Sequence, residues 1–129
     1  MDIIEILKED YKKFPAAQTY SIYAEKVYFQ DPMNRFKGID RYQQMIGFMS
    51  TFFKDIKLDL HNISQVGDRI ETRWTLSWTV PVPWQPRIAV PGWSELKLNT
   101  EGLISSHIDY WNCSRLDVLK QLLFPVKTR

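Results

Sequence analysis

The spacing of apolar residues changes near residue 55, and this change limits the possible folds more than any other feature. Before it, apolar residues recur every three or four positions, which is typical of helices; after it, they alternate with polar residues, which is typical of strands. Helices that precede a run of strands indicate an α+β fold. The 129 residues are expected to form one domain, spanning residues 1–129.

The helical part of the chain is predicted to contain three helices and one short strand. The first helix covers residues 3–14 and stops at Pro15, because proline cannot continue a helix. A second helix is expected at residues 19–26, and residues 27–29 form a short strand. The most regular helical pattern covers residues 39–54.

The second part of the chain is predicted to form four strands and a final helix. In chain order the segments are a strand at 56–60, a turn at Gly67-Asp68, a strand at 69–80, a proline-broken loop at 81–91, strands at 93–99 and 103–112, and a short helix from Ser114. Trp84 in the loop is expected to cover a cavity, to touch a partner or to pack on its own sheet. Alternating strands of this kind predict a curved antiparallel sheet that is covered by helices on one face.

Aromatic residues make up 14% of the chain, with five Trp, six Tyr and seven Phe. Aromatic side chains bury large areas, so they predict either a bulky core or a cavity that is walled by rings. We expect a cavity that suits a flat apolar molecule. The residues expected to line it are Tyr11, Tyr23, Phe29, Met45, Met49, Trp74, Leu76, Trp78, Ser94, Leu96 and Trp111.

Charge and residue usage argue against several classes of function. The net charge of +2 without a basic run gives no sign of nucleic-acid binding. A single cysteine, two histidines and no Gly-x-Gly pair give no sign of a disulfide framework, a metal site, a phosphate-binding loop or a cofactor. The first residues do not resemble a signal peptide and no apolar run is long enough to span a membrane, so a cytoplasmic protein is expected.

Two stretches and one glycine resemble a known superfamily. Residues Ile22–Pro32 and Gly102–Trp111, together with Gly38 before the long helix, resemble the nuclear transport factor 2-like superfamily. This superfamily includes ketosteroid isomerases and SnoaL-like polyketide cyclases. The resemblance implies a cystatin-like α+β cone, in which N-terminal helices pack on the concave face of a curved antiparallel sheet.

A narrower resemblance is carried by three shorter stretches. Residues Phe29–Gly38, Arg73–Trp78 and His107–Trp111 are similar to an uncharacterised family of cyanobacterial and plant proteins. That family implies no known activity. The wider superfamily contains enzymes, ligand binders and interaction modules, so the fold does not select one function.

The resemblance to ketosteroid isomerases suggests roles for three residues. Asp31 matches the aspartate that acts as their general base, although an aspartate before proline also commonly starts a turn. Tyr11 lies near the position of an oxyanion-stabilising tyrosine, and it is equally interpreted as a core residue with its hydroxyl at the rim of a pocket. Ser94 stands where the isomerases have a protonated aspartate, and this departure argues against a steroid-isomerase mechanism.

The resemblance to SnoaL-like cyclases points to the last strand. His107, Asp109 and Trp111 are spaced two apart, so they share one face of that strand. In the cyclases a similar His and Asp point into the pocket, and the Asp acts as acid and base. Alternation leaves the direction open, because Ile108 and Tyr110 on the opposite face would also suit a core.

Three functions follow as hypotheses. The first is binding of a small apolar molecule that contains rings, with Asp31, His107 and Asp109 as polar anchors. The second is an isomerase, cyclase or lyase that uses Asp31 or Asp109 as its general base. The third is a homodimeric interaction module that associates through the outer face of the sheet, where Trp93 and Tyr110 would lie.

Overall fold

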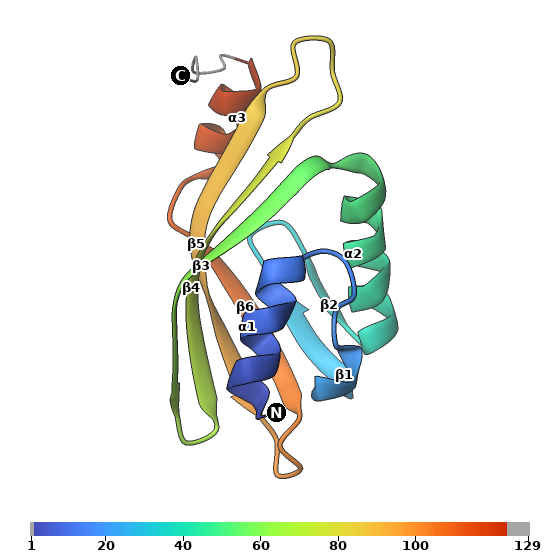
Figure 1. The fold of residues 1–129 in the computed structure, drawn as a ribbon, viewed down its shortest axis with the longest axis vertical. Helices are drawn as coiled ribbons and strands as arrows, with labels where there is room; N and C mark the ends of the chain where they lie inside the picture. Colours follow the sequence, from blue (N-terminus) through green and yellow to red (C-terminus); the bar gives the residue numbers. More distant parts are fainter. Residues whose placement is uncertain (1, 124–129) are drawn as a thin grey trace.

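The computed structural model describes residues 2–123, which form three α-helices and a six-stranded sheet (Figure 1). The predicted domain of residues 1–129 includes residue 1 and residues 124–129, which lie outside the described residues. In chain order the elements are α1 (Ile3–Lys13), the single-turn 3₁₀ helix η1 (Tyr20–Ile22), β1 (Tyr23–Gln30), β2 (Arg35–Lys37), α2 (Ile39–Phe52), β3 (Lys54–Val66), β4 (Arg69–Thr79), β5 (Arg87–Leu98), β6 (Ile104–Trp111) and α3 (Arg115–Leu123).

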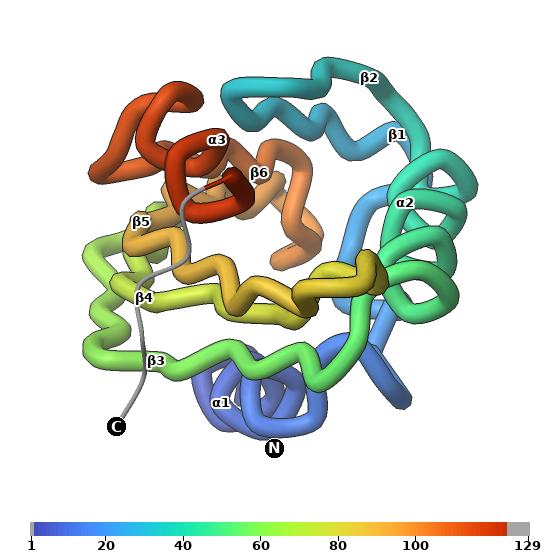
Figure 2. The backbone as a smooth tube through the Cα atoms, turned by 90° about the horizontal axis from the view of Figure 1, so that it is seen from above, coloured from blue at the N-terminus to red at the C-terminus, as the bar shows by residue number. Residues whose placement is uncertain are grey.

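The sheet has the strand order β2-β1-β6-β5-β4-β3. Four of its pairings are antiparallel, but β1 and β6 are parallel. The sheet is therefore mixed, whereas the sequence predicts a purely antiparallel sheet. Figure 2 shows that the strands curve around a central space, with α2 at one side of this space and α1 next to β3. The edge strands β2 and β3 do not pair with each other, so the sheet stays open. The fold is the α+β cone that the sequence predicts.

Helix α1 covers the concave face of the long strands. It starts at Asp2, whose side chain accepts a hydrogen bond from the Glu5 backbone N–H at 2.9 Å and so satisfies one of the free donors of the first turn. Its buried residues Leu7 and Tyr11 pack into one core with Trp74 and other apolar side chains of β4, β5 and β6. This packing holds α1 against the sheet.

Helix α2 forms the second wall. Gly38 precedes it with a φ of +108°, which a residue with a side chain rarely adopts. The helix covers Ile39–Phe52, close to the predicted residues 39–54, and it buries Tyr42 and Ile46 against Phe29 of β1.

The predicted helix at residues 19–26 is wrong. Only the turn η1 is helical there, and the chain then enters β1 at Tyr23. Thr19 does not cap a helix, because its backbone N–H and its hydroxyl both donate to the buried Asp10 carboxylate at 3.0 and 2.8 Å. Pairing of β1 with β2 and β6 outweighs the local helical spacing.

The predicted loop at residues 81–91 is too long, because β5 already begins at Arg87. Pro91 is accommodated in β5 because its carbonyl accepts from Asn112 just past the end of β6. Its nitrogen, on the same side of the strand, therefore interrupts no ladder bond to β4. In the loop, Trp84 donates from Nε1 to the Leu122 carbonyl of α3 at 2.8 Å, is 54% exposed and does not belong to the cavity wall.

Candidate functional site

A cavity of about 560 Å³ lies between the concave face of the sheet and helices α1 and α2. Asp31, His107 and Asp109 all belong to its wall. Of the apolar and polar residues that the sequence predicts at a cavity, the wall contains Tyr11, Tyr23, Phe29, Met45, Met49, Trp74, Leu76, Trp78, Ser94 and Trp111. The volume is in the range of small-molecule sites in proteins.

Two of the predicted lining residues differ from expectation. Leu96 does not reach the cavity, because it is completely buried in the core with Ile70 and Ile104. Tyr11 lines the cavity, but its hydroxyl is not at a rim, because it pairs with the buried Thr72 hydroxyl at 2.9 Å. Burial raises the pKa of the Tyr11 phenol above its usual value, so this hydroxyl stays protonated.

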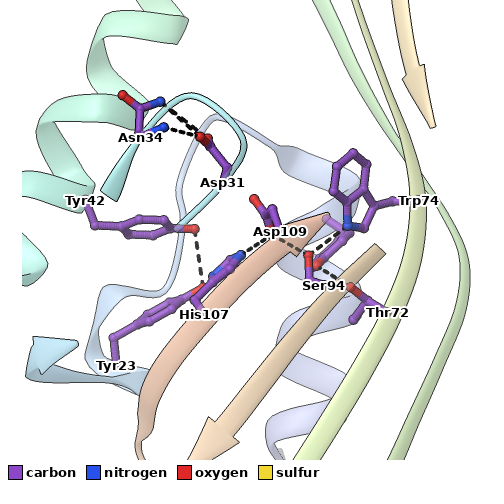
Figure 3. A network of polar contacts seen from close by, with 10 residues as sticks. Tyr23, Asp31, Asn34, Tyr42, Thr72, Trp74, Ser94, His107 and Asp109 are labelled. Carbon is purple, nitrogen blue, oxygen red and sulfur yellow. Dashed lines mark hydrogen bonds and ion pairs between the residues drawn. The ribbon is translucent and has the colours of Figure 1, made fainter. Parts of the chain in front are cut away.

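Strands β4, β5 and β6 together hold a chain of polar contacts (Figure 3). The Trp74 Nε1–H donates to Ser94 Oγ at 2.8 Å, and Ser94 Oγ donates to Asp109 Oδ1 at 2.5 Å. The same Asp109 oxygen contacts His107 Nε2 at 2.7 Å. Ser94 and Asp109 share one face of the sheet because they lie directly opposite each other in the pairing of β5 with β6, and all four residues belong to the cavity wall. The direction that alternation left open is therefore inward for His107 and Asp109.

His107 has one unusual atom. Its side chain is only 9% exposed, and its Nδ1 atom is buried without a hydrogen-bond partner within residues 2–123. A second proton on this ring would create a buried N–H with no acceptor. With a proton on Nε2, the ring donates to Asp109 and leaves Nδ1 as the buried atom without a partner.

Asp31 follows β1 and faces the same cavity. Its Oδ1 accepts from the backbone N–H groups of Met33 and Asn34 at 2.8 and 2.6 Å, so Asp31 also stabilises its turn. Burial raises the pKa of the Asp31 carboxyl above its usual value, and the negative charge of Asp109 raises it further. The hydrogen bonds from Met33 and Asn34 act in the opposite direction. Both carboxyl groups belong to the wall of the same cavity.

Tyr42 is the most important wall residue that the sequence analysis missed. Its hydroxyl lies 3.4 Å from the Tyr23 hydroxyl, and its ring centroid lies 5.7 Å from that of His107 (Figure 3). Burial raises the pKa values of both tyrosines above the usual value. The signal was available, because Tyr42 belongs to the apolar stripe that predicts α2.

Exposed apolar side chains also contribute to the wall. Met33 and Phe48 are 60% and 55% exposed, yet both line the cavity. Arg41 is a further wall residue, and its guanidinium lies 5.5 Å above the centre of the Phe36 ring. The cavity therefore reaches the surface beside α2 and the loop after β1.

The outer face of the sheet carries the aromatic pair that motivates the dimer hypothesis. The rings of Trp93 and Tyr110 stack with centroids 4.2 Å apart, and Tyr110 is 38% exposed. The homodimer stays a prediction. Within residues 2–123, no helix combines the length and apolar character needed to cross a membrane. In the same part of the chain, no three side chains that could hold a metal ion gather together.

Comparison with known proteins decides the family. The model of the uncharacterized conserved protein family DUF2358 matches residues 1–107. The chain belongs to the DUF2358 family. This assignment agrees with the resemblance to an uncharacterised family, while the cyanobacterial and plant origin stays a prediction. A search of the curated proteins finds no match.

Solved structures support the fold of this DUF2358 chain. A putative SnoaL-like polyketide cyclase from Jannaschia sp. is similar with a TM-score of 0.76 and 14% identity, over 95% of this chain and 92% of that chain. A hypothetical protein with a ketosteroid isomerase-like fold from Catenulispora acidiphila, in complex with trimethylamine, has a TM-score of 0.75 and 17% identity, over 97% and 96% of the two chains. An LEH-like epoxide hydrolase from M. tuberculosis has a TM-score of 0.71 and 16% identity, over 93% and 86%. The superfamily resemblance is confirmed at the level of the fold.

Proposed function

We propose that the protein binds a small apolar molecule that contains rings, in the cavity between the sheet and α1 and α2. The observation that carries this proposal is a space of about 560 Å³ whose wall combines aromatic rings with a few polar groups. Ligand sites in proteins are commonly lined in this way, because apolar walls supply affinity and a few polar atoms fix orientation. Asp31, His107 and Asp109 are the proposed polar anchors.

A neutral fluorescent dye with fused rings, phenylnaphthylamine, tests this proposal. Its emission rises when it leaves water for an apolar site, so a saturable rise on titration into the protein is expected. Trp74, Trp78 and Trp111 line the cavity, so their fluorescence is expected to fall over the same dye concentrations. A dye signal that never saturates, with unchanged tryptophan emission, would argue against an internal site.

Filling the cavity is expected to weaken dye binding. Met49 on α2 lines the cavity, so the larger indole of Met49→Trp would occupy part of it and weaken binding by about tenfold or more. The neighbouring Ser50 is exposed and absent from the wall, so Ser50→Trp is the matched control with unchanged affinity. Thermal melting establishes that both variants fold. Equal affinities of the two variants would place the dye outside the cavity.

A second candidate function is proton transfer, as in an isomerase, cyclase or lyase, with Asp31 or Asp109 as the base. The observation that favours it is the raised pKa of Asp31, since a general base works best when its pKa approaches the working pH. The polar contacts of Asp109 with Ser94 and His107 offer a way to hold that carboxylate in position.

Titration of the Asp31 carboxyl carbon by NMR tests this candidate. We expect its pKa to lie above about 3.9 in the wild type, and to fall in Asp109→Asn, because removing a negative charge makes ionisation easier. Asp59→Asn removes the same charge outside the cavity wall and is expected to leave the pKa of Asp31 unchanged. A wild-type pKa at or below the ordinary value would eliminate Asp31 as a base near neutral pH.

A further inference from the structure

The two cavity carboxylates each have an oxygen without a good protein partner. Asp109 uses Oδ1 for both Ser94 and His107, and its Oδ2 makes no hydrogen bond within residues 2–123. Asp31 uses Oδ1 for two backbone N–H groups, and its Oδ2 has only the Asn34 side-chain amide at 3.4 Å. Figure 3 shows both carboxyl groups in the same region, with Asp31 coming from the loop after β1 and Asp109 from β6. The free atoms here are hydrogen-bond acceptors.

The buried imidazole of His107 contains an acceptor atom that solvent does not reach. Nδ1 of His107 has no partner, and with the ring proton on Nε2 this atom carries a free lone pair. The His107 side chain is more than nine-tenths buried and belongs to the cavity wall.

The charges around the cavity are unbalanced. Its wall contains the carboxylates of Asp10, Asp31 and Asp109, but only one guanidinium, that of Arg41. Asp10 is already bound by the N–H and hydroxyl of Thr19, and Arg41 is exposed on α2 with its guanidinium over Phe36. Within the described residues, no Lys or Arg side chain pairs with Asp31 or Asp109, and the imidazole of His107 is the group in contact with the Asp109 carboxylate. Both carboxylates are half-buried, so a cation placed beside them would gain binding energy from their charge.

The aromatic rings around these groups also favour a cation. The Tyr42 ring lies next to His107, and Phe29 lies close to both, with centroids 5.5 and 5.1 Å away. The electron-rich faces of aromatic rings attract positively charged groups.

We propose that the ligand of this cavity is a protonated amine with an apolar, ring-containing body. Its ammonium N–H groups would donate to the free oxygens of Asp31 and Asp109, and its body would lie against Trp74 and Trp78. This inference rests on the proposed binding function and specifies the chemical class of the ligand.

Three probes with the same two-ring body and different charge test the inference. Naphthylmethylamine is cationic at neutral pH, naphthylmethanol is neutral and keeps a hydrogen-bond donor, and naphthoate is anionic. Titration calorimetry of the wild-type protein at low salt is expected to give a dissociation constant for the amine at least tenfold below that of the alcohol. The anion is expected to bind more weakly than either.

Single-charge variants locate the preference. Asp109→Asn and Asp31→Asn keep side-chain size and remove one charge each, so each is expected to lower the amine-to-alcohol affinity ratio several-fold. Asp59→Asn is the matched control, because Asp59 pairs with Lys57 and does not belong to the cavity wall. If one cavity variant does not fold, the other variant and the wild-type probe series still decide.

The outcomes separate the two proposals. If the alcohol binds as tightly as the amine, or the acid binds best, the binding function stands and the cation preference is wrong. If the amine-to-alcohol affinity ratio is the same in Asp59→Asn, Asp31→Asn and Asp109→Asn, the preference comes from the electrostatic field of the whole protein and not from the two cavity carboxylates. The inference is then also wrong. If none of the probes and no neutral dye binds, the proposed function itself fails.

Discussion

Gly92→Ala is expected to lower the free energy of unfolding by about 3 kcal/mol. A Cβ at Gly92 would lie 2.5 Å from the Tyr110 carbonyl oxygen and 2.6 Å from Cη2 of the Trp74 indole. The first contact is with the backbone of β6, which pairs with β5 at this point and cannot move without breaking the ladder. The second is with a ring that forms part of the cavity wall, so the sheet, the indole or both must shift.

Gly47→Ala is the matched control for this substitution. Gly47 lies in α2, is exposed, and has no atom within 4 Å of an added Cβ. Alanine favours the helix over glycine by up to about 1 kcal/mol, so this variant is expected to be slightly more stable than wild type. Chemical denaturation of both variants measures the difference. A Gly92→Ala variant as stable as wild type would contradict the close packing of Trp74 on β5.

Ser94→Ala is expected to cost about 2 kcal/mol of stability. The hydroxyl of Ser94 is the acceptor for Trp74 Nε1 and a donor to Asp109, and Ser94 itself is only 1% exposed. Without it, a buried indole N–H has no acceptor and the Asp109 carboxylate loses one donor. An unsatisfied buried donor costs more than an ordinary hydrogen bond contributes.

A double-mutant cycle isolates the contact between Trp74 and Ser94. Trp74→Phe removes the donor of this contact. In the Trp74→Phe background, Ser94→Ala is therefore expected to lower the free energy of unfolding by less than it does in the wild type, and the difference is expected to be roughly 1 kcal/mol or more. Ser106→Ala is the control: Ser106 lies on β6 on the opposite face from His107, and its hydroxyl has no partner within residues 2–123. Strictly additive losses in the cycle would mean that the two side chains do not interact.

Regular patterns in the sequence predicted most of the fold. The alternation in β4 is strong because its even-numbered residues, such as Ile70, Thr72 and Trp74, are buried while its odd-numbered neighbours face outward. The stripe of α2 is equally clear, because one side of this helix is buried against β1. In both elements local spacing and tertiary burial agree, so local reasoning succeeds.

Long-range contacts explain what the sequence did not reveal. The parallel pairing of β1 with β6 joins residues about eighty positions apart, and no local spacing signals it. The direction of His107 and Asp109 was undetermined because both faces of β6 carry residues that suit a core. The assembled structure shows the direction, because His107, Asp109 and the paired Ser94 all belong to the cavity wall.

The indole N–H signals in an NMR titration with phenylnaphthylamine test most directly whether the cone holds a ligand. Trp74, Trp78 and Trp111 line the cavity, while Trp93 stacks on Tyr110 at the outer face and serves as a reference within the same molecule. We expect the three cavity signals to shift in a saturable way and the Trp93 signal to stay in place. Unchanged cavity signals, or a shift of Trp93 alone, would contradict binding between the helices and the sheet.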